Sequence, residues 1–156
     1  PHWTPLAGYP ERPTTRLPGI TVAIAQIKAQ QDAKLVTWTG PAAFEAHGRK
    51  PLVLPPTLAD KGLLRFDTIV QAAPSGKVTI AVSSAALDAT RLFTRLANKG
   101  AQSVAIPLAC FRARGADPAD TDTPFGIMSD GPFAAAFGNI DVVATAPQAV
   151  ACEALR

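Results

Sequence analysis

The sequence predicts a mainly β protein (α+β), folded as an antiparallel β-sandwich or a partly closed barrel with one amphipathic helix. Short segments in which apolar and polar side chains alternate are typical of strands with one buried face. Turn residues separate these segments, so most neighbours are expected to pair as hairpins, and about eight such strands favour a sandwich or barrel. One segment, residues 85–98, carries apolar residues at helical spacing instead.

The first half of the chain is predicted to form two hairpins. Residues 20–28 alternate, and the polar turn 30–32 returns the chain into a second strand at 34–39. A short strand at 43–46 and its return at 52–54 form the second predicted hairpin. The next strand is expected over 63–71, and a turn then leads into residue 78.

The central segment 78–111 alternates first, with Val78, Ile80 and Val82 on one face. Ser83 and Ser84 are predicted to cap a helix over 85–98, because their oxygens can accept the free N–H groups of a first helical turn. Gly100 is expected to end it in the left-handed conformation, ahead of a strand over 104–110.

This order of strand, helix and strand raises the question of a nucleotide-binding βαβ unit. Such a unit needs glycines between the first strand and the helix, where the backbone approaches the phosphate. The chain has serines and alanines there and neither glycine-rich phosphate motif elsewhere. The helix is therefore predicted to pack on a sheet in an interaction protein.

The second half is predicted to close the sheet. The loop after residue 111 holds Asp117, Asp120 and Asp122, but without the glycine and glutamate of a calcium loop it is expected to be a solvated connection. Strands are expected at 125–129 and 139–146, with Asp130-Gly131 as a hairpin turn after the first. Residues 149–156 are predicted to form a closing helical turn or a frayed end.

The chain divides into an extended proline-rich arm, residues 1–19, and a single sandwich domain, residues 20–156. The arm carries five prolines, which exclude a helix and a β-ladder. Trp3, Leu6 and Tyr9 are either anchors on a neighbouring molecule or part of a disordered tail.

The charge pattern excludes several partners. The formal net charge is +3, with Lys and Arg scattered and no dense basic stripe, so no specific nucleic-acid binding is expected. No apolar run approaches the roughly 20 residues that cross a bilayer, so no membrane insertion is expected. Cys110 and Cys152 lack metal-ligand spacing. Cys110 is predicted to be a small buried side chain in a strand rather than half of a bridge.

Candidate catalytic residues are few. His47, the single internal histidine, could join Ser129 and an aspartate in a triad, but no nucleophile motif surrounds Ser129. Asp67 and Asp141 fall on the outward period of their strands, which does not indicate acid-base work. No catalytic, cofactor-binding or metal site is therefore predicted, no cofactor is expected, and the protein is not expected to be an enzyme.

The order of these elements resembles tail hub and distal-tail (baseplate) proteins of tailed bacteriophages over about residues 20–146. The stretches that carry the resemblance are ITVAIAQIKAQQDAKLVTWTG, AAFEAHGRKPLVL, KGLLRFDTIVQ, SGKVTIAVSSAALDATRLFTRLANKGAQSVAIPLACF, TPFGIMSDGP and NIDVVATA. The resemblance implies a tail-tube-like β-sandwich that forms rings around the tail channel and has no enzyme activity.

The main functional hypothesis is therefore a virion structural protein of a phage tail or related injection machine. Its expected partners are other copies of itself in a ring and adjacent tail or baseplate proteins, and its expected place is the virion, assembled in the host bacterial cytoplasm. One alternative is a small α/β enzyme or ligand-binding domain with a parallel crossover over 78–111 and a site near Ser83 and Ser84. Another is a secreted β-domain stapled by Cys110 and Cys152.

Overall fold

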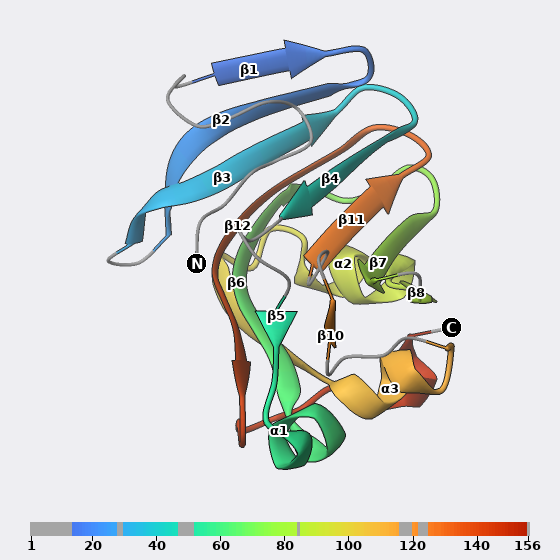
Figure 1. Cartoon of the computed structure of the whole chain (residues 1–156). Helices are drawn as coiled ribbons and strands as arrows, with labels where there is room; N and C mark the ends of the chain where they lie inside the picture. Colours follow the sequence, from blue (N-terminus) through green and yellow to red (C-terminus); the bar gives the residue numbers. More distant parts are fainter. Residues whose placement is uncertain are drawn as a thin grey trace.

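Two antiparallel β-sheets packed face to face form the fold (Figure 1). The computed structural model describes residues 14–27, 30–46, 52–83, 85–115, 120–121 and 125–155. The larger sheet has the strand order β1-β2-β3-β12-β6-β9, and the smaller has the order β4-β11-β7-β8. The predicted sandwich is thus confirmed, and the alternative of a partly closed barrel is not the fold observed.

Each sheet draws its strands from distant parts of the chain. The six-stranded sheet consists of β1 (Thr14–Leu17), β2 (Ile20–Ile27), β3 (Gln30–Trp38), β6 (Leu63–Ala72), β9 (Ala101–Pro107) and β12 (Phe133–Val143). The four-stranded sheet consists of β4 (Ala42–Ala46), β7 (Val78–Val82), β8 (Ala85–Asp88) and β11 (Phe125–Ser129). The remaining elements are the paired β5 (Leu52–Val53) and β10 (Asp120–Thr121), the helices α1 (Pro56–Lys61), α2 (Thr90–Leu96) and α3 (Leu108–Arg112), and a 3-10 helix, Cys152–Ala154.

An aromatic cluster fills the space between the sheets. All seven phenylalanines and Trp38 are buried. Six of these eight side chains lie on strands, where alternation points them inward, and Phe93 and Phe111 lie on α2 and α3. Phe137 of β12 lies at the centre, with five aromatic rings around it at centroid distances of 5.8 to 6.5 Å. The sequence has few aromatic residues, and the fold places nearly all of them in one core.

The first predicted hairpin is confirmed, and the second is wrong. Strands β2 and β3 pair with Ile20 opposite Trp38, although residues 30–32 belong to β3 rather than to the turn. The expected partners 43–46 and 52–54 separate: β4 pairs with β11, and β5 pairs with β10. Alternation identifies a strand but does not name its partner.

The predicted helix over 85–98 is also wrong in its first part. Residues 85–88 form β8, which returns along β7 in a hairpin with Val82 opposite Ala85, and the helix α2 begins only at Thr90. Ala85 and Leu87 are buried on one face of β8, so apolar spacing that fits a helix here also fits a strand. Gly100 does take a positive φ of 73°, as predicted.

Ser83 turns the chain and does not cap a helix. Ser83 has a left-handed φ of 54° in the β7–β8 connection, and Ser84 lies outside the described residues. Strand β7 lies in the four-stranded sheet and β9 in the six-stranded one. The parallel crossover that the enzyme alternative required is therefore absent from 78–83 and 85–111, and so is its cleft at the carboxyl end of a parallel strand.

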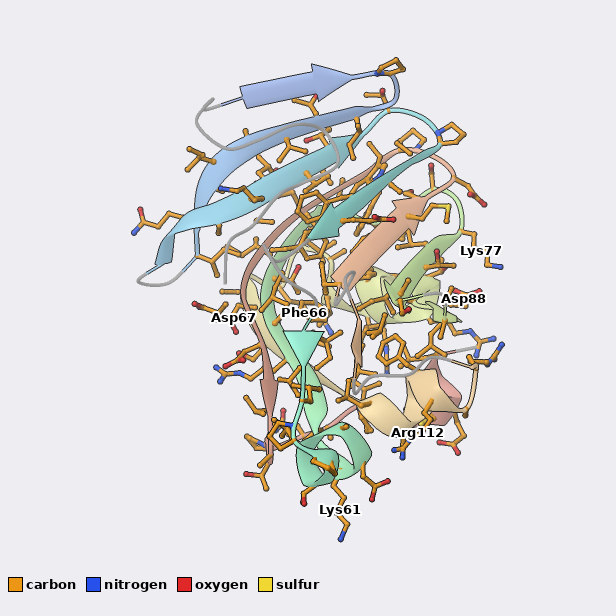
Figure 2. All side chains as sticks on the ribbon, in the orientation of Figure 1. Lys61, Phe66, Asp67, Lys77, Asp88 and Arg112 are labelled. Atoms are coloured by element: carbon orange, nitrogen blue, oxygen red, sulfur yellow. A yellow bond between two sulfur atoms is a disulfide. The ribbon has the colours of Figure 1, made fainter. Side chains whose placement is uncertain are left out.

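Asp88 and Thr90 fasten α2 to the smaller sheet. The Asp88 carboxylate accepts the Thr90 backbone N–H at 2.9 Å, and the Thr90 hydroxyl oxygen accepts the Val78 N–H at 2.9 Å. Burial opposes ionisation of Asp88, but the hydrogen bonds from Thr90 and the nearby charges of Lys77 and Arg91 outweigh it and lower the pKa of this carboxyl. Figure 2 shows Asp88 and Lys77 close together at this end of the sandwich.

We expect Thr90→Val to lower the free energy of unfolding by about 1 to 3 kcal/mol, because the shape is kept while the Val78 N–H loses its acceptor. Chemical denaturation monitored by fluorescence measures this loss. Thr94→Val is the matched control: Thr94 is exposed and donates only to the carbonyl of its own helix at 2.7 Å, so its replacement should change stability by less than about 0.5 kcal/mol. Equal effects of the two substitutions would contradict the assigned role of Thr90.

Asp130-Gly131 links the two sheets and does not make the predicted hairpin. Strand β11 pairs with β4 and β7, whereas β12 pairs with β3 and β6. The link is held by the Asp130 N–H, which donates to the Lys77 carbonyl at 3.0 Å, and by the Ser75 N–H, which donates to the Pro132 carbonyl at 3.1 Å. The final strand begins at Phe133, ahead of the predicted 139–146, and ends at Val143.

The prediction for Cys110 is wrong in both its secondary structure and its bonding. The residue lies in α3 rather than in a strand, and it forms a disulfide with Cys152. Its predicted burial is confirmed at 2 % exposure. The bridge that the third hypothesis required is therefore present, and it ties the 3-10 helix near the C-terminus to α3.

The proline-rich arm lies largely outside the described residues, and Trp3, Leu6 and Tyr9 are among those not described. Its proline-free part, Thr14–Leu17, forms β1 and pairs with β2, so the expectation that the arm makes no ladder fails there. The division into an arm 1–19 and a domain 20–156 stays a prediction. Asp117 and Asp122 also lie outside the description, and Asp120 belongs to β10.

Candidate functional site

Of the candidates for a catalytic triad, Ser129 and Asp141 each make a contact with a residue close in the sequence. His47 lies outside the described residues. Ser129 is buried, and its hydroxyl donates to the Gly131 carbonyl at 2.7 Å, which fixes the turn between the sheets. The Asp141 carboxylate accepts the N–H of its neighbour Val142 at 2.8 Å. In the described ranges these groups have local structural roles.

Polar residues gather instead on the outer face of the six-stranded sheet. Along β6, Phe66 points into the core and Asp67 to the opposite side, as Figure 2 shows. In the pairing of β6 with β9, Asp67 lies opposite Ser103 and Arg65 lies opposite Ala105. Outward alternation, correctly predicted for Asp67, thus brings Arg65, Asp67 and Ser103 onto one surface.

Asp67 is the centre of a hydrogen-bond network although it lies on the outer face. It is only 1 % exposed, and its two carboxylate oxygens accept from the Ser103 hydroxyl at 2.5 Å and from the Asn139 side-chain amide at 2.7 Å. Asn139 has a left-handed φ of 49° and lies at a register shift of β12 against β6. This irregularity aims its amide at Asp67, as bulges commonly redirect a side chain.

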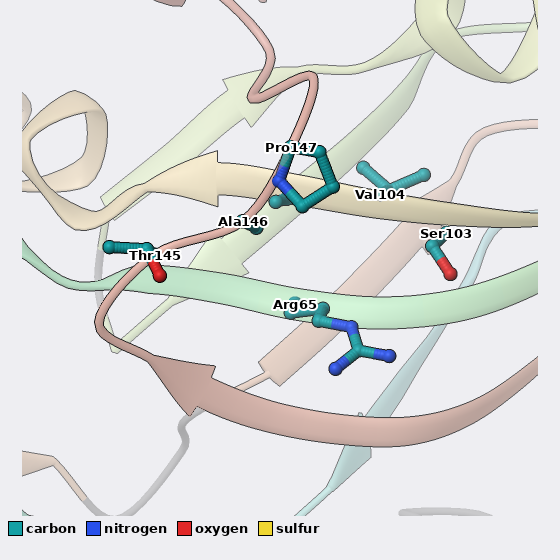
Figure 3. Close-up of a pocket in the computed structure, with 7 residues that line it drawn as sticks. Arg65, Ser103, Val104, Thr145, Ala146 and Pro147 are labelled. Atoms are coloured by element: carbon teal, nitrogen blue, oxygen red, sulfur yellow. The ribbon is translucent and has the colours of Figure 1, made fainter.

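A pocket of about 270 Å³ lies next to this network. Strands β6 and β9 form its floor, and the segment that follows β12 forms its wall. Figure 3 shows Arg65 rising from β6 between Thr145 and Ser103, with Pro147 over β9. The lining residues are Arg65, Ser103, Val104, Ala105, Thr145, Ala146 and Pro147.

The wall of the pocket is anchored on its far side. The Val150 N–H donates to the Ala105 carbonyl of β9 at 2.8 Å, the Cys110–Cys152 bridge follows, and Leu155 is fully buried in the core. These three attachments hold the chain after residue 144 against β9. They keep Thr145, Ala146 and Pro147 in place above the floor.

Arg65 supplies the positive charge of the pocket. Its side chain is partly buried and makes no hydrogen bond or ion pair with another residue in the part of the chain that the structure describes. Asp141 lies opposite Arg65 in the strand register, yet its carboxylate binds a backbone N–H. None of the residues that line the pocket is a carboxylate.

The described residues contain neither a metal-binding cluster nor a helix that could span a membrane. The ranges that the structure covers hold no group of three or more His, Cys, Asp or Glu side chains arranged for a metal ion. They also hold no helix with the length and apolar character that crossing a bilayer requires.

The chain thus forms an antiparallel β-sandwich that has a pocket of mixed polar and apolar lining on one outer face. Residues 11–142 match the family model Exop_C, described as galactose-binding domain-like, and this chain belongs to that family. No curated protein matches the chain.

Solved structures show the same fold. The exo-1,3/1,4-β-glucanase ExoP of a Pseudoalteromonas species matches with a TM-score of 0.69 and 16% identity over 85% of this chain, which spans only 16% of the glucanase. The extra C-terminal domain of that enzyme matches with a TM-score of 0.68 and 16% identity over 85% of this chain and 75% of the domain. The family 30 carbohydrate-binding module of the cellulase Cel9D-Cel44B of Clostridium thermocellum matches with a TM-score of 0.60 and 13% identity over 90% of this chain and 91% of the module.

These matches overturn the phage-tail hypothesis. The family is galactose-binding domain-like, and the matching structures are a glucanase, its C-terminal domain and a carbohydrate-binding module. Three expectations that depended on this hypothesis are therefore also wrong: the ring of identical copies, the tail or baseplate partners, and the location in a virion. The resemblance rested on the order of elements, which unrelated β-sandwiches share.

Sequence reasoning missed the pocket itself. Asp67 was considered only as an acid-base candidate, and Arg65 and Ser103 were not singled out. A signal was present: three polar side chains on the outward period of two strands. Their meeting depends on the pairing of β6 with β9, which alternation does not reveal.

Proposed function

We propose that this domain binds a carbohydrate, without catalysing a reaction on it, in the pocket between Arg65 and Pro147. The observation that carries the proposal is the pocket itself, which combines the guanidinium of Arg65 and the hydroxyl groups of Ser103 and Thr145 with small apolar side chains on a sheet face. Such a combination suits a sugar ring, which has hydroxyl groups at its edge and apolar C–H groups on its faces. Family membership and the carbohydrate-binding module among the similar structures support it.

The lining residues argue against hydrolysis in this pocket. Glycoside hydrolysis generally needs two carboxyl groups on either side of the scissile bond. No carboxylate lines the pocket, and Asp67 below it is buried with both oxygens engaged by Ser103 and Asn139. We therefore propose that the pocket binds a saccharide and does not hydrolyse its glycosidic bonds.

The size and the composition of the pocket limit the ligand. Drug-sized ligands occupy pockets of about 300 to 1,000 Å³, and this pocket, at about 270 Å³, lies just below that range. One saccharide unit is therefore the expected occupant. Eight of the ten aromatic residues are buried in the core, and Trp3 and Tyr9 lie outside the described residues. Hydrogen bonds and the ring of Pro147 are thus the contacts that the described part offers.

The disulfide fits this role. Disulfides persist in oxidising environments such as the periplasm or the cell exterior. Structural polysaccharides occur outside the cytoplasm, so the Cys110–Cys152 bridge supports a domain that works where its ligand is found.

Filling the pocket should abolish binding. Ala146→Leu adds apolar volume at the wall and no aromatic ring that could itself stack on a sugar. Affinity electrophoresis against a panel of polysaccharides, including mixed-linkage β-glucan and galactan, should retard the unmodified protein, and Ala146→Leu should cut the affinity by about tenfold or more.

The matched control is Ala86→Leu, an exposed position of β8 in the other sheet, which should bind like the unmodified protein. No binding of any saccharide by the unmodified protein would refute the proposed function. Equal binding by all three proteins would place the site elsewhere.

A further inference from the structure

We propose that the pocket recognises an acidic sugar, a uronic acid whose carboxylate pairs with Arg65. This inference rests on the proposed function, and it names the class of saccharide that the pocket selects. A carboxylate and a guanidinium can form two parallel hydrogen bonds, a geometry that adds orientation to charge attraction.

Arg65 has the properties that such a role needs. Its guanidinium is partly buried, lines the pocket and has no protein partner among the described residues. A cation held at a pocket without a carboxylate is an incomplete pair, because burial raises the cost of leaving it unpaired. A structural arginine on this face would be expected to engage Asp141, its register neighbour, but Asp141 binds the Val142 N–H instead.

The hydrogen-bonding groups of the pocket favour a ligand that brings acceptors. The carboxylate nearest to Arg65 in its own strand is Asp67, whose oxygens accept from Ser103 and Asn139. The Ser103 hydroxyl already donates its proton in a hydrogen bond to Asp67, and both Asp67 oxygens already accept hydrogen bonds. Donors of Arg65 remain for the ligand, so the ligand must bring acceptors, and a carboxylate brings two oxygens in one plane.

The net charge of the chain is also consistent with an anionic ligand. The chain carries a formal net charge of +3, which attracts an anionic saccharide and does not repel it.

Paired monosaccharides that differ at one carbon test the inference. Titration calorimetry or NMR titration would compare D-galacturonate with D-galactose and D-glucuronate with D-glucose. We expect at least one uronate to bind about 10-fold or more tightly than its neutral partner, since hydrogen bonds to charged groups are among the stronger ones. Raising the salt concentration from about 0.05 M to about 0.5 M should weaken the uronate and leave the neutral sugar unchanged.

Arg65→Gln should remove the preference and bring the two affinities together, and Arg65→Lys should restore part of it, because the charge returns without the planar fork. Arg95→Gln, an exposed position of α2, is the matched control and should keep the full preference. Circular dichroism establishes that each variant is folded, and the salt titration of the unmodified protein tests the inference independently of any variant.

The outcomes separate the two proposals. Binding of galactose or glucose as tightly as their uronates, unaffected by Arg65→Gln, would overturn the acidic-sugar inference and leave carbohydrate binding intact. Binding of galactose 6-sulfate more tightly than galacturonate would overturn the assignment of a carboxylate and point to a sulfate ester. No binding of any saccharide, in the panel or here, would refute the proposed function itself.

Discussion

Replacing Phe137 with alanine is expected to lower the free energy of unfolding by about 4 kcal/mol. The ring is 2 % exposed and lies within 6.5 Å, centroid to centroid, of Trp38, Phe44, Phe66, Phe93 and Phe125. Its removal leaves a cavity between two sheets whose backbones are held by ladders and cannot collapse to fill it. Guanidinium chloride unfolding, followed by tryptophan fluorescence, measures the loss directly because Trp38 belongs to the same cluster.

Phe111→Ala provides the matched comparison for this prediction. Phe111 of α3 is equally buried at 0 % exposure, but it makes no ring contact with another aromatic residue in the described part of the chain. Aromatic pairs contribute about 0.5 to 1.5 kcal/mol beyond the burial of their area. Phe137→Ala should therefore cost more than Phe111→Ala, and the reverse order would show that the aromatic cluster is not the centre of the core.

Much of the sandwich was predictable because strand formation is local. The sequences of 20–28, 63–71, 78–82 and 125–129 predict strands that the structure contains, and in 20–28 and 78–82 alternation alone indicates the strand because one face is buried. The pairing of these strands was not predictable. Asp130-Gly131 carries the residues of a hairpin turn, yet it joins strands of different sheets, because the neighbours of β11 and β12 are decided by packing of the whole core.

Two prolines stand at the starts of helices. Pro107 ends β9 and immediately precedes α3, and Pro56 occupies the first turn of α1. Proline has no N–H for a ladder, but its fixed φ suits the start of a helix. The strand predicted over 104–110 runs through Pro107 into residues that are helical, and α1 was not predicted.

The candidate site was less predictable than the fold. Arg65, Ser103 and Asn139 are separated along the chain and meet only through the β6–β9 pairing and the register shift in β12. The wall, residues 145–147, takes its place because Val150 and Cys152 attach the chain to β9 and α3. Each of these contacts is non-local, so neither periodicity nor motif spacing records it.

Removing the disulfide with the double variant Cys110→Ala/Cys152→Ser is expected to lower the free energy of unfolding by about 4 kcal/mol. The chain-entropy model gives this magnitude for a bridge that closes a loop of 42 residues, because the cross-link restricts the unfolded chain. Chemical denaturation provides the measurement. A reducing agent should lower the unfolding midpoint of the unmodified protein toward that of the variant and should leave the variant unchanged.

The same variant connects stability to the pocket. The bridge anchors the chain beyond Val150, and that chain holds Thr145, Ala146 and Pro147 over the floor of β6 and β9. A looser wall binds less well, because ordering it on binding costs conformational entropy. We therefore expect saccharide affinity to fall in the folded double variant under conditions where its circular dichroism matches that of the unmodified protein. Unchanged affinity in a folded variant would mean that the Val150 hydrogen bond and the burial of Leu155 suffice to hold the wall.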